Sequence, residues 1–286
     1  MRSLPALVKV RVSALAGLSA LSGLLAGSGD WTLILPLGVG VFLLACGACG
    51  LNECLEAGTD KRMSRTKDRP LPSGAMSPGL AALVSTALLV LGSGLLYLSG
   101  GLLVGALGLG AAAWYDLVYT PLKRVTAFAA APGALVGAVP PALGWLAAGR
   151  SLDDPRLLAV AAFFYLWQVP HFWLLAPEQE PDLKCAGLPA ACSCLGRSGI
   201  GRLSAVWMTA ASAAALAFPA FGCLRSVPAC LVLACASAWL TWEAVRLMSG
   251  PLDAPALRRA FLRVNGHSLL VMLLLSADPF LRSSGL

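Results

Sequence analysis

The chain has 286 residues, of which 58% are apolar and only 12% are charged, and its mean hydropathy is +0.77. A soluble domain of this length carries about twice that share of charge, so the composition excludes an ordinary soluble enzyme and indicates a membrane protein. The net charge of +7 does not indicate nucleic-acid binding, because no segment outside the apolar stretches is long enough to fold as a separate basic domain.

Apolar runs of about 20 residues, the length with which a helix crosses a bilayer, recur along the whole chain. The first run has basic residues inside its apolar part, which favours a transmembrane helix over a signal peptide. No long Arg- and Ser-rich leader precedes it, so we expect a bacterial cell (inner) membrane. The sequence predicts an all-α polytopic protein with nine transmembrane helices in a single domain, residues 1–286. The nine runs are 5–26, 32–51, 77–97, 101–119, 126–148, 157–176, 203–221, 227–247 and 261–277.

Basic residues are distributed unevenly between the two sides of this nine-span arrangement. One side, with the N-terminus, holds 17 of the 21 Lys and Arg residues. The other side holds only Arg150, Arg156, Arg225 and Arg282. Since short cytoplasmic loops of membrane proteins are rich in Lys and Arg, the N-terminus is expected in the cytoplasm and the C-terminus outside.

A hydrophilic loop follows the second run, with nine charges between residues 51 and 74. Asn52, Glu56 and Asp60 are spaced i, i+4, i+8, so on a helix they share one face. Carboxylate and amide oxygens suit Mg²⁺, which typically bridges carboxylates to substrate phosphates. Five basic residues follow in the same loop, and Arg offers planar, multidentate recognition of phosphate. The alternative is that these acids are simply solvated beside the positive charge that sets the topology.

A second acidic group follows the sixth run on the same side of the membrane. Glu178 and Asp182 are four residues apart, although Pro177 and Pro181 limit how far a helix runs here. Two acidic groups from different helices are able to hold two metal ions against one diphosphate.

The nine cysteines lie mostly in apolar surroundings. Cys46 and Cys49 form a C-x-x-C inside a predicted span, but Gly50 follows where a haem-attachment motif has His. We interpret the cysteines as small buried hydrophobic residues.

Four stretches resemble intramembrane (UbiA-type) prenyltransferases. Residues 52–74, NECLEAGTDKRMSRTKDRPLPSG, are similar to the family's N-x-x-x-D-x-x-x-D-x-x-M-x-R-T-x-x-R-P-x-x-x-G loop. The other three are similar to its haem-farnesylating branch: VYTPLKRVT (118–126), GALVGAVPPALGWLAAG (133–149) and YLWQVPHFWLLA (165–176). The resemblance runs from about Leu4 to Asp278. The chain departs from the family at Glu56, where Asp is usual, and around Asp182, where Gln179 and Leu183 replace the usual Arg and Tyr.

The resemblance implies nine helices around a central cavity and a cytoplasmic cap of loops and short helices that carries two acidic motifs and Mg²⁺. It implies transfer of a farnesyl group from farnesyl diphosphate to a vinyl group of protoheme IX, which gives heme O and diphosphate. Beside these two substrates and the lipid bilayer, the partner implied is a downstream membrane protein of haem modification or oxidase assembly.

On this reading each candidate residue has a role. Asn52, Glu56, Asp60 and Asp182 are the expected catalytic metal ligands, with Glu178 as a further ligand. The diphosphate contacts are Arg65, Arg69, Lys123, Arg124 and Lys61. An allylic cation needs electron-rich aromatic faces, and Tyr119 and Trp167 are the expected substrate-binding rings, with Trp114, Tyr115, Phe172 and Trp173 as further candidates. The alternative is that some of these rings form an interfacial aromatic belt.

His171 is one of only two histidines and lies in an apolar segment, where an ionisable residue indicates function. It is expected to ligate haem iron or to bind a haem propionate. The alternative is that it bonds a carbonyl group freed by Pro170. We interpret His267 as structural.

Two other functions remain open from the sequence. One is a related prenyltransferase that acts on an aromatic quinone precursor. The other is a transporter or a non-catalytic membrane protein that binds haem or isoprenoids. A transporter would more often show inverted repeats, and we find no internal repeat in the sequence.

Overall fold

The computed structural model describes residues 3–27, 30–250 and 252–283, and these residues form helices and no β-strand. The short elements are α1 (Ser3–Leu7), η1 (Trp31–Leu33), the π-helix η2 (Trp114–Tyr119), α5 (Thr120–Leu122), α8 (Ala176–Ala186) and α10 (Phe218–Phe221). The long helices are α2 (Val10–Gly27), α3 (Ile34–Asp60), α4 (Pro78–Ala113), α6 (Ala130–Ala147), α7 (Pro155–Trp173), α9 (Ala191–Leu216), α11 (Val227–Ser249) and α12 (Ala254–Ser283). The all-helical prediction is confirmed.

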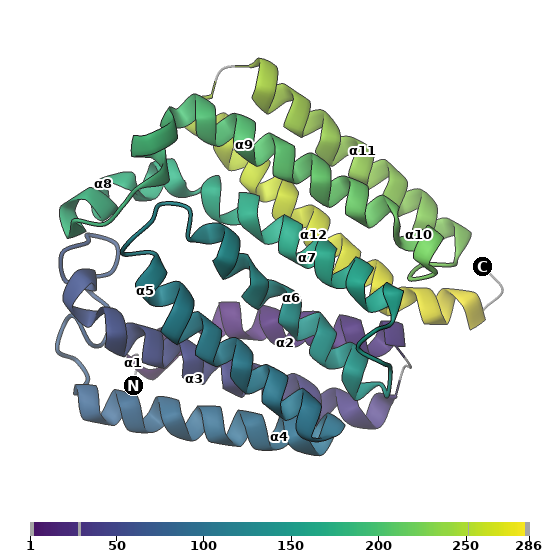
Figure 1. Cartoon of the computed structure of the whole chain (residues 1–286), viewed down its shortest axis with the longest axis horizontal. Coiled ribbons are helices and arrows are strands. Elements are labelled where there is room, and N and C mark those ends of the chain that lie inside the picture. Colours follow the sequence, from purple (N-terminus) through teal and green to yellow (C-terminus); the bar gives the residue numbers. More distant parts are fainter. Residues whose placement is uncertain (1–2, 28–29, 251, 284–286) are drawn as a thin grey trace.

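The long helices pack as two groups, one from each half of the chain. Helices α2, α3, α4 and α6 pack together in one half, and α7, α9, α11 and α12 pack in the other. The halves join where α6 contacts α7 and where α12 contacts α2 (Figure 1). Each half has its own apolar core, with Trp145 and Leu37 in the first and Phe163 and Phe218 in the second.

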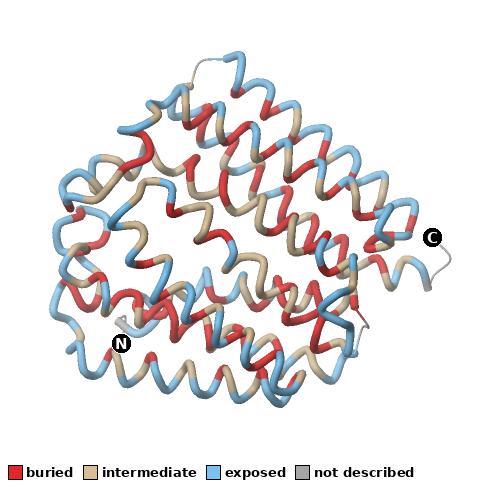
Figure 2. The backbone as a smooth tube through the Cα atoms, in the orientation of Figure 1, coloured by how far each residue is buried: buried red, intermediate tan, exposed pale blue. Residues whose placement is uncertain are grey.

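The outer surfaces of the helices are strongly apolar. Buried residues face inward, and the exposed positions on the long helices face outward (Figure 2). Leu35, Leu98, Leu102 and Val125 are each more than 70% exposed. Exposed apolar area on this scale would cause a soluble protein to associate, whereas it suits a lipid environment. The protein is therefore an integral membrane protein.

The number of membrane passes depends on one break in α4. Among the described residues, seven helices are long and apolar enough to cross a membrane, or eight if α7 and α8, bent by 65°, are one span. The longest of them, Pro78–Leu122, changes direction at Gly101, whose φ of +74° is a conformation that glycine adopts without strain. Beyond the break, Gly108 lies against Leu96, as in an antiparallel hairpin. Two passes here would give nine, so the count of nine stays a prediction.

Hydrophilic elements gather at one end of the bundle. The loop after α3, the turn after α5 and α8 lie together on the left of Figure 1, whereas the last turns of α12 lie at the opposite end. Helix α8 ends at Ala186, and the next residue, Gly187, caps it in the left-handed conformation with a φ of +72°. The predicted cap is therefore present at the end that carries residues 52–74. Two pockets found among the described residues lie at the ends of helices, one at Arg225 and one at Glu178, and not in the middle of the bundle, so the central cavity stays a prediction.

Helices α2 and α6 approach each other so closely that only glycine fits at their contact. A Cβ atom at Gly144 would lie 1.9 Å from the carbonyl oxygen of Ala20, and one at Gly23 would lie 2.0 Å from that of Pro141. Because both obstacles are backbone atoms, a side chain here would force the helices apart.

Gly144→Ala is therefore expected to lower the free energy of unfolding by about 1–3 kcal/mol, the usual cost of overpacking a core. The matched control is Gly94→Ala in α4, where no atom lies within 4 Å of the new Cβ and where alanine is the better helix former. Thermal unfolding in detergent measures both changes. Equal melting temperatures for the two variants would show that α2 and α6 are not in close contact.

Candidate active site

The last three turns of α3 carry the first acidic motif on one buried face. Asn52, Glu56 and Asp60 are all less than 8% exposed. Each side chain meets a different basic group. Lys9 Nζ donates to Asn52 Oδ1 at 3.2 Å, Lys123 Nζ contacts Glu56 Oε2 at 2.6 Å, and Arg69 Nη1 contacts Asp60 Oδ2 at 2.7 Å. A buried charge is tolerated only with such partners, so the acidic face and the basic groups depend on each other.

The loop that follows α3 is fixed to the bundle by polar contacts along its length. Glu53, which is fully buried, accepts from the backbone N–H of Leu71 at 3.0 Å. Thr66 donates its hydroxyl to the carbonyl group of Asp60 at 2.9 Å. These contacts bend the loop back over the end of α3, which brings Arg69 to Asp60. Lys61 and Arg65 are exposed on the outside of the same loop.

A second basic group comes from the end of the α4–η2–α5 segment. Lys123 follows α5, and its Nζ lies 5.3 Å from the ring centre of Tyr119 as well as against Glu56. Burial lowers the pKa of Lys123, and the Glu56 carboxylate opposes this shift. Arg124 donates to the carbonyl group of Leu55 at 2.7 Å. The predicted diphosphate contacts Lys123, Arg124 and Arg69 therefore surround the last turns of α3.

The second acidic motif lies on α8 and faces the loop after α3. Asp182 Oδ1 accepts from the backbone N–H and the hydroxyl of Ser64, at 2.9 and 2.6 Å, and Oδ2 accepts from the N–H of Arg65 at 3.1 Å. The hydrogen bonds from Ser64 hold the pKa of Asp182 below its usual range. Glu178 instead lines a small pocket with Arg197 and Leu257. Asp182 thus binds α8 to the loop that follows the first motif.

The donor set on α3 fits Mg²⁺ in its chemistry, because two carboxylates and an amide oxygen are hard oxygen ligands on one face. Within the described residues, no three His, Cys, Asp or Glu side chains lie close enough together to hold a metal ion. One oxygen of each of the three α3 side chains instead contacts a basic group, so a metal ion bound by those oxygens would compete with Lys9, Lys123 and Arg69. The roles of Glu178 and Asp182 as ligands stay a prediction.

A row of aromatic rings leads from Tyr115 to helix α12. Neighbouring ring centres are 5.6 Å apart for Tyr115 and Tyr119, 6.2 Å for Tyr119 and Phe172, and 5.5 Å for Phe172 and His171. His171 continues the row to Phe261 at 5.2 Å. Trp167 also contacts His171, with ring centres 5.4 Å apart. The predicted substrate-binding rings Tyr119 and Trp167 therefore belong to one aromatic row, which begins beside Lys123.

Two further aromatic candidates lie outside this row. Trp114 donates its indole N–H to the carbonyl group of Pro132, and Trp173 packs against Phe128 and Trp207. Neither ring contacts a member of the row among the described ring pairs, so a role of either in substrate binding stays a prediction.

The hydrogen bond of His171 determines which of its ring nitrogens has a free lone pair. Asn265 donates Nδ2 to the carbonyl group of Phe261 at 2.6 Å, so its Oδ1 is the acceptor that faces His171 Nδ1 at 2.7 Å. Nδ1 therefore carries the proton, and the lone pair is on Nε2. A histidine held in this way is prepared to accept a metal ion or a hydrogen bond at Nε2. His267 instead pairs with Ser237 at 3.0 Å, in keeping with the structural role expected for it.

Sequence reasoning missed four residues that position the site. Lys9 was not assigned to the site, yet it has a left-handed φ of +46° between α1 and α2 and its Nζ donates to Asn52. Thr120 accepts from Asn52 Nδ2 at 2.8 Å, and its place in the stretch VYTPLKRVT was an available signal. Glu53 and Asn265 were the other two. Glu53 lies next to Asn52 in the first acidic motif, and Asn265 is a polar residue in an apolar run.

Asp182→Asn is expected to loosen the loop, because an amide replaces one acceptor oxygen with a donor that faces the backbone N–H of Ser64 or Arg65. Trypsin cleavage after Lys61, Arg62, Arg65 and Lys67 should then be faster than in the unmodified protein. The control is Glu180→Gln on the same helix, whose carboxylate contacts Lys184 and Ser193 and not the loop. Since the pKa of Asp182 is depressed, its hydrogen bonds to the loop should persist down to about pH 3.9, the ordinary aspartate pKa, and be lost only as the pH falls below it. Hydrogen exchange of the loop amides measures this at pH values where trypsin is inactive. Cleavage at an unchanged rate in Asp182→Asn would contradict this role.

Comparison with known proteins agrees with this architecture. The chain matches the UbiA prenyltransferase family over residues 12–265. It is 42% identical over 219 residues to the protoheme IX farnesyltransferase of Geobacter sulfurreducens, covering 76% of this chain and 80% of that one. It is 34% identical over 284 residues to that of Oleidesulfovibrio alaskensis, covering 99% and 98%.

Solved structures show the same fold. A UbiA homologue from Aeropyrum pernix K1 superimposes with a TM-score of 0.74 at 17% identity, covering 96% of this chain and 98% of that one. A UbiA homologue from Archaeoglobus fulgidus, whose structure contains DMAPP and Mg²⁺, superimposes with a TM-score of 0.70 at 14% identity, covering 98% and 99%. The chain therefore belongs to the UbiA prenyltransferase family.

Proposed function

We propose that the protein transfers a farnesyl group from farnesyl diphosphate to a vinyl group of protoheme IX, giving heme O and diphosphate. The observation that carries the proposal is the buried Asn52–Glu56–Asp60 face with its basic partners, at the start of an aromatic row that leads to His171. The names of the relatives in Geobacter sulfurreducens and Oleidesulfovibrio alaskensis support the same substrates.

The chain has the parts needed to bind an allylic diphosphate. Asn52, Glu56 and Asp60 would hold Mg²⁺, with Asp182 and Glu178 as the second pair. Bound Mg²⁺ would neutralise charge on the diphosphate and so help it to leave. Arg69 and Lys123 now neutralise the acids, and both would turn to the diphosphate oxygens once the carboxylates bind the metal. Lys61, Arg65 and Arg124 surround this position and add positive charge.

The allylic carbon would react beside the aromatic row. As the C1–O bond of farnesyl diphosphate breaks, positive charge would develop on C1, and the face of Tyr119 would stabilise it. The vinyl group of the haem supplies the electron pair for the new C–C bond. The resulting cation takes up water, which loses a proton and leaves a hydroxyl group. No covalent bond to the protein is needed.

His171 would orient the haem. Its Nε2 lone pair is available for the iron or for a protonated propionate, because Asn265 fixes the proton on Nδ1. Trp167 and Phe261 flank the imidazole and would offer flat surfaces to the macrocycle.

We also place the cap, and with it the N-terminus, in the cytoplasm of a bacterial cell. Its support is the 17 to 4 distribution of basic residues between the two sides. The product would then pass to a downstream haem-modifying or oxidase-assembly protein in the same membrane.

Asp60→Asn and Glu56→Gln are each expected to lower farnesyl transfer by orders of magnitude, because each removes a metal-binding carboxylate and leaves Arg69 or Lys123 without its partner. The matched control is Asp68→Asn, which removes an exposed carboxylate from the same loop. Heme O formation by purified protein, with varied Mg²⁺, measures the effect. Near-normal turnover by Asp60→Asn would remove the metal assignment.

His171→Ala should weaken haem binding and shift the Soret band, while the affinity for farnesyl diphosphate stays the same because the cap holds the diphosphate. His267→Ala removes the other histidine and should leave the Soret band in place. Titration of each purified variant with haem separates the two. An unchanged spectrum in His171→Ala would make His171 structural, and prenylation of a small aromatic acid without haem binding would favour the quinone-precursor function.

A further inference from the structure

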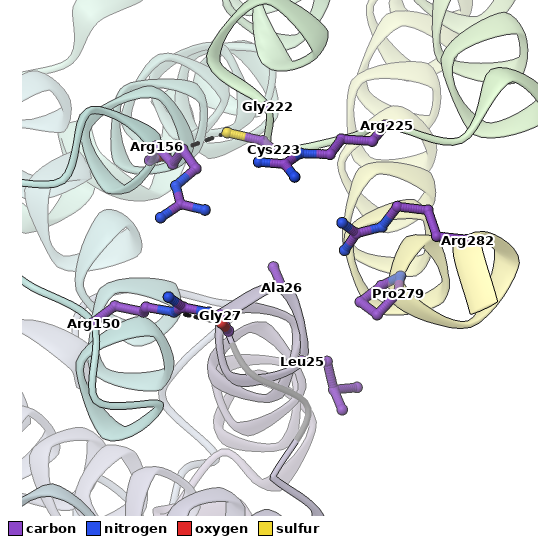
Figure 3. Close-up of a pocket in the computed structure, with 10 residues that line it drawn as sticks. All are labelled: Leu25, Ala26, Gly27, Arg150, Arg156, Gly222, Cys223, Arg225, Pro279 and Arg282. Atoms are coloured by element: carbon purple, nitrogen blue, oxygen red, sulfur yellow. Dashed lines mark hydrogen bonds between the residues drawn. The ribbon is translucent and has the colours of Figure 1, made fainter.

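The four basic residues on the side opposite the cap converge on one cavity. Arg150, Arg156, Arg225 and Arg282 all line a pocket of about 200 Å³ between the end of α2, the start of α7, the turn after α10 and the end of α12. Their guanidinium groups point into the same space (Figure 3). Arg150 and Arg225 come from two connections, and Arg156 and Arg282 come from the ends of two helices, so the fold itself gathers them.

This pocket has more positive than negative charge among the described residues. Arg156 pairs with Asp154 at 2.7 Å, and Arg282 pairs with Asp278 at 3.0 Å. Asp278 also binds the backbone, because its Oδ1 accepts hydrogen bonds from the N–H groups of Arg225 and Ser226. Arg150 donates Nε to the carbonyl group of Gly27 at 2.7 Å. Among the described residues neither Arg150 nor Arg225 forms an ion pair with a carboxylate, although the charge of Arg150 also acts on Asp154.

Arg225 is held next to the pocket with its donors free. No hydrogen bond or ion pair of its guanidinium group is found among the described residues. Gly222 lies beside it with a left-handed φ of +72°, and a Cβ atom there would come within 3.3 Å of the Arg225 guanidinium. Glycine thus keeps the space around these five donors open, and planar guanidinium donors match the oxygens of a phosphate group.

The position of the pocket along the membrane helices is the level at which lipid headgroups are expected. It is at the ends of membrane helices, and the ring of Trp31 packs on that of Phe280 with centres 5.1 Å apart, next to Pro279 at the pocket wall. Trp31 is 59% exposed, as expected for a ring in the interfacial belt. Arg156 and His171 are fifteen residues apart on α7, or about 22 Å, so the haem that His171 would orient does not bring its propionates here.

We propose that this pocket binds the phosphate group of an anionic phospholipid in the leaflet opposite the cap, with Arg225 as the principal donor. The acyl chains would lie along the exposed apolar faces of the neighbouring helices. A free phosphate ion has the same chemistry, and the experiment below separates the two sources.

The test uses the full-length protein purified in detergent. Native mass spectrometry measures its affinity for phosphatidylglycerol and for phosphatidylcholine, in the unmodified protein and in Arg225→Gln. The control is Arg258→Gln, which removes an exposed arginine near the other end of α12. Arg225→Gln should lower the affinity for phosphatidylglycerol by about tenfold, the effect of losing charge-assisted hydrogen bonds, while Arg258→Gln does not. Farnesyl transfer should be normal in both variants, which also shows that they fold.

Three outcomes would overturn the proposal. One is equal affinity for phosphatidylglycerol in Arg225→Gln and Arg258→Gln. Another is equal affinity of the unmodified protein for phosphatidylglycerol and phosphatidylcholine. The third is displacement of phosphatidylglycerol by millimolar inorganic phosphate in the unmodified protein and not in Arg225→Gln, which would make this a site for the free ion.

Discussion

The buried acidic face of α3 is the constraint on which the rest of the site depends. Glu56 and Asp60 lie at the end of a helix whose preceding turns are apolar, and both are almost completely buried. An uncompensated carboxylate in such a place costs several kcal/mol, so each needs a cation nearby. Lys123 and Arg69 supply the charge, and the segments that carry them must fold onto α3. The acids thus determine where the loop after α3 and the turn after α5 lie.

The same constraint bears on the proposed function. Glu56 and Asp60 with Lys123 and Arg69 form a neutral set of charges. Mg²⁺ and a diphosphate would bring both cations and anions, so the acids and the bases would exchange partners while the total charge stayed balanced. Glu56 replaces the family's usual Asp, and its extra methylene group still reaches Lys123. The left-handed Lys9 costs about 1–3 kcal/mol of backbone strain, which its contact with Asn52 helps to offset.

Much of the fold could be predicted from hydropathy, since an apolar run of about 20 residues has few other uses. The predicted break between the third and fourth runs, residues 98–100, lies next to the non-helical Gly100 and Gly101. The start of α9 at Ala191 lies before the seventh run, which begins at 203, because Gly196, Arg197 and Arg202 interrupt the apolar pattern there. The i, i+4, i+8 spacing correctly predicted one helical face. It could not predict the partners, because the contacts of Lys9 with Asn52 and of Asp182 with Ser64 join residues 43 and 118 positions apart.

We expect the bases that neutralise α3 to move to the substrate when it binds. A structure of the protein with Mg²⁺ and a non-hydrolysable thio-analogue of farnesyl diphosphate would show this. Lys123 Nζ and the Arg69 guanidinium should lie within hydrogen-bond distance of diphosphate oxygens, with Glu56 and Asp60 on the metal ion. Intact Lys123–Glu56 and Arg69–Asp60 pairs, with the diphosphate bound elsewhere, would contradict it.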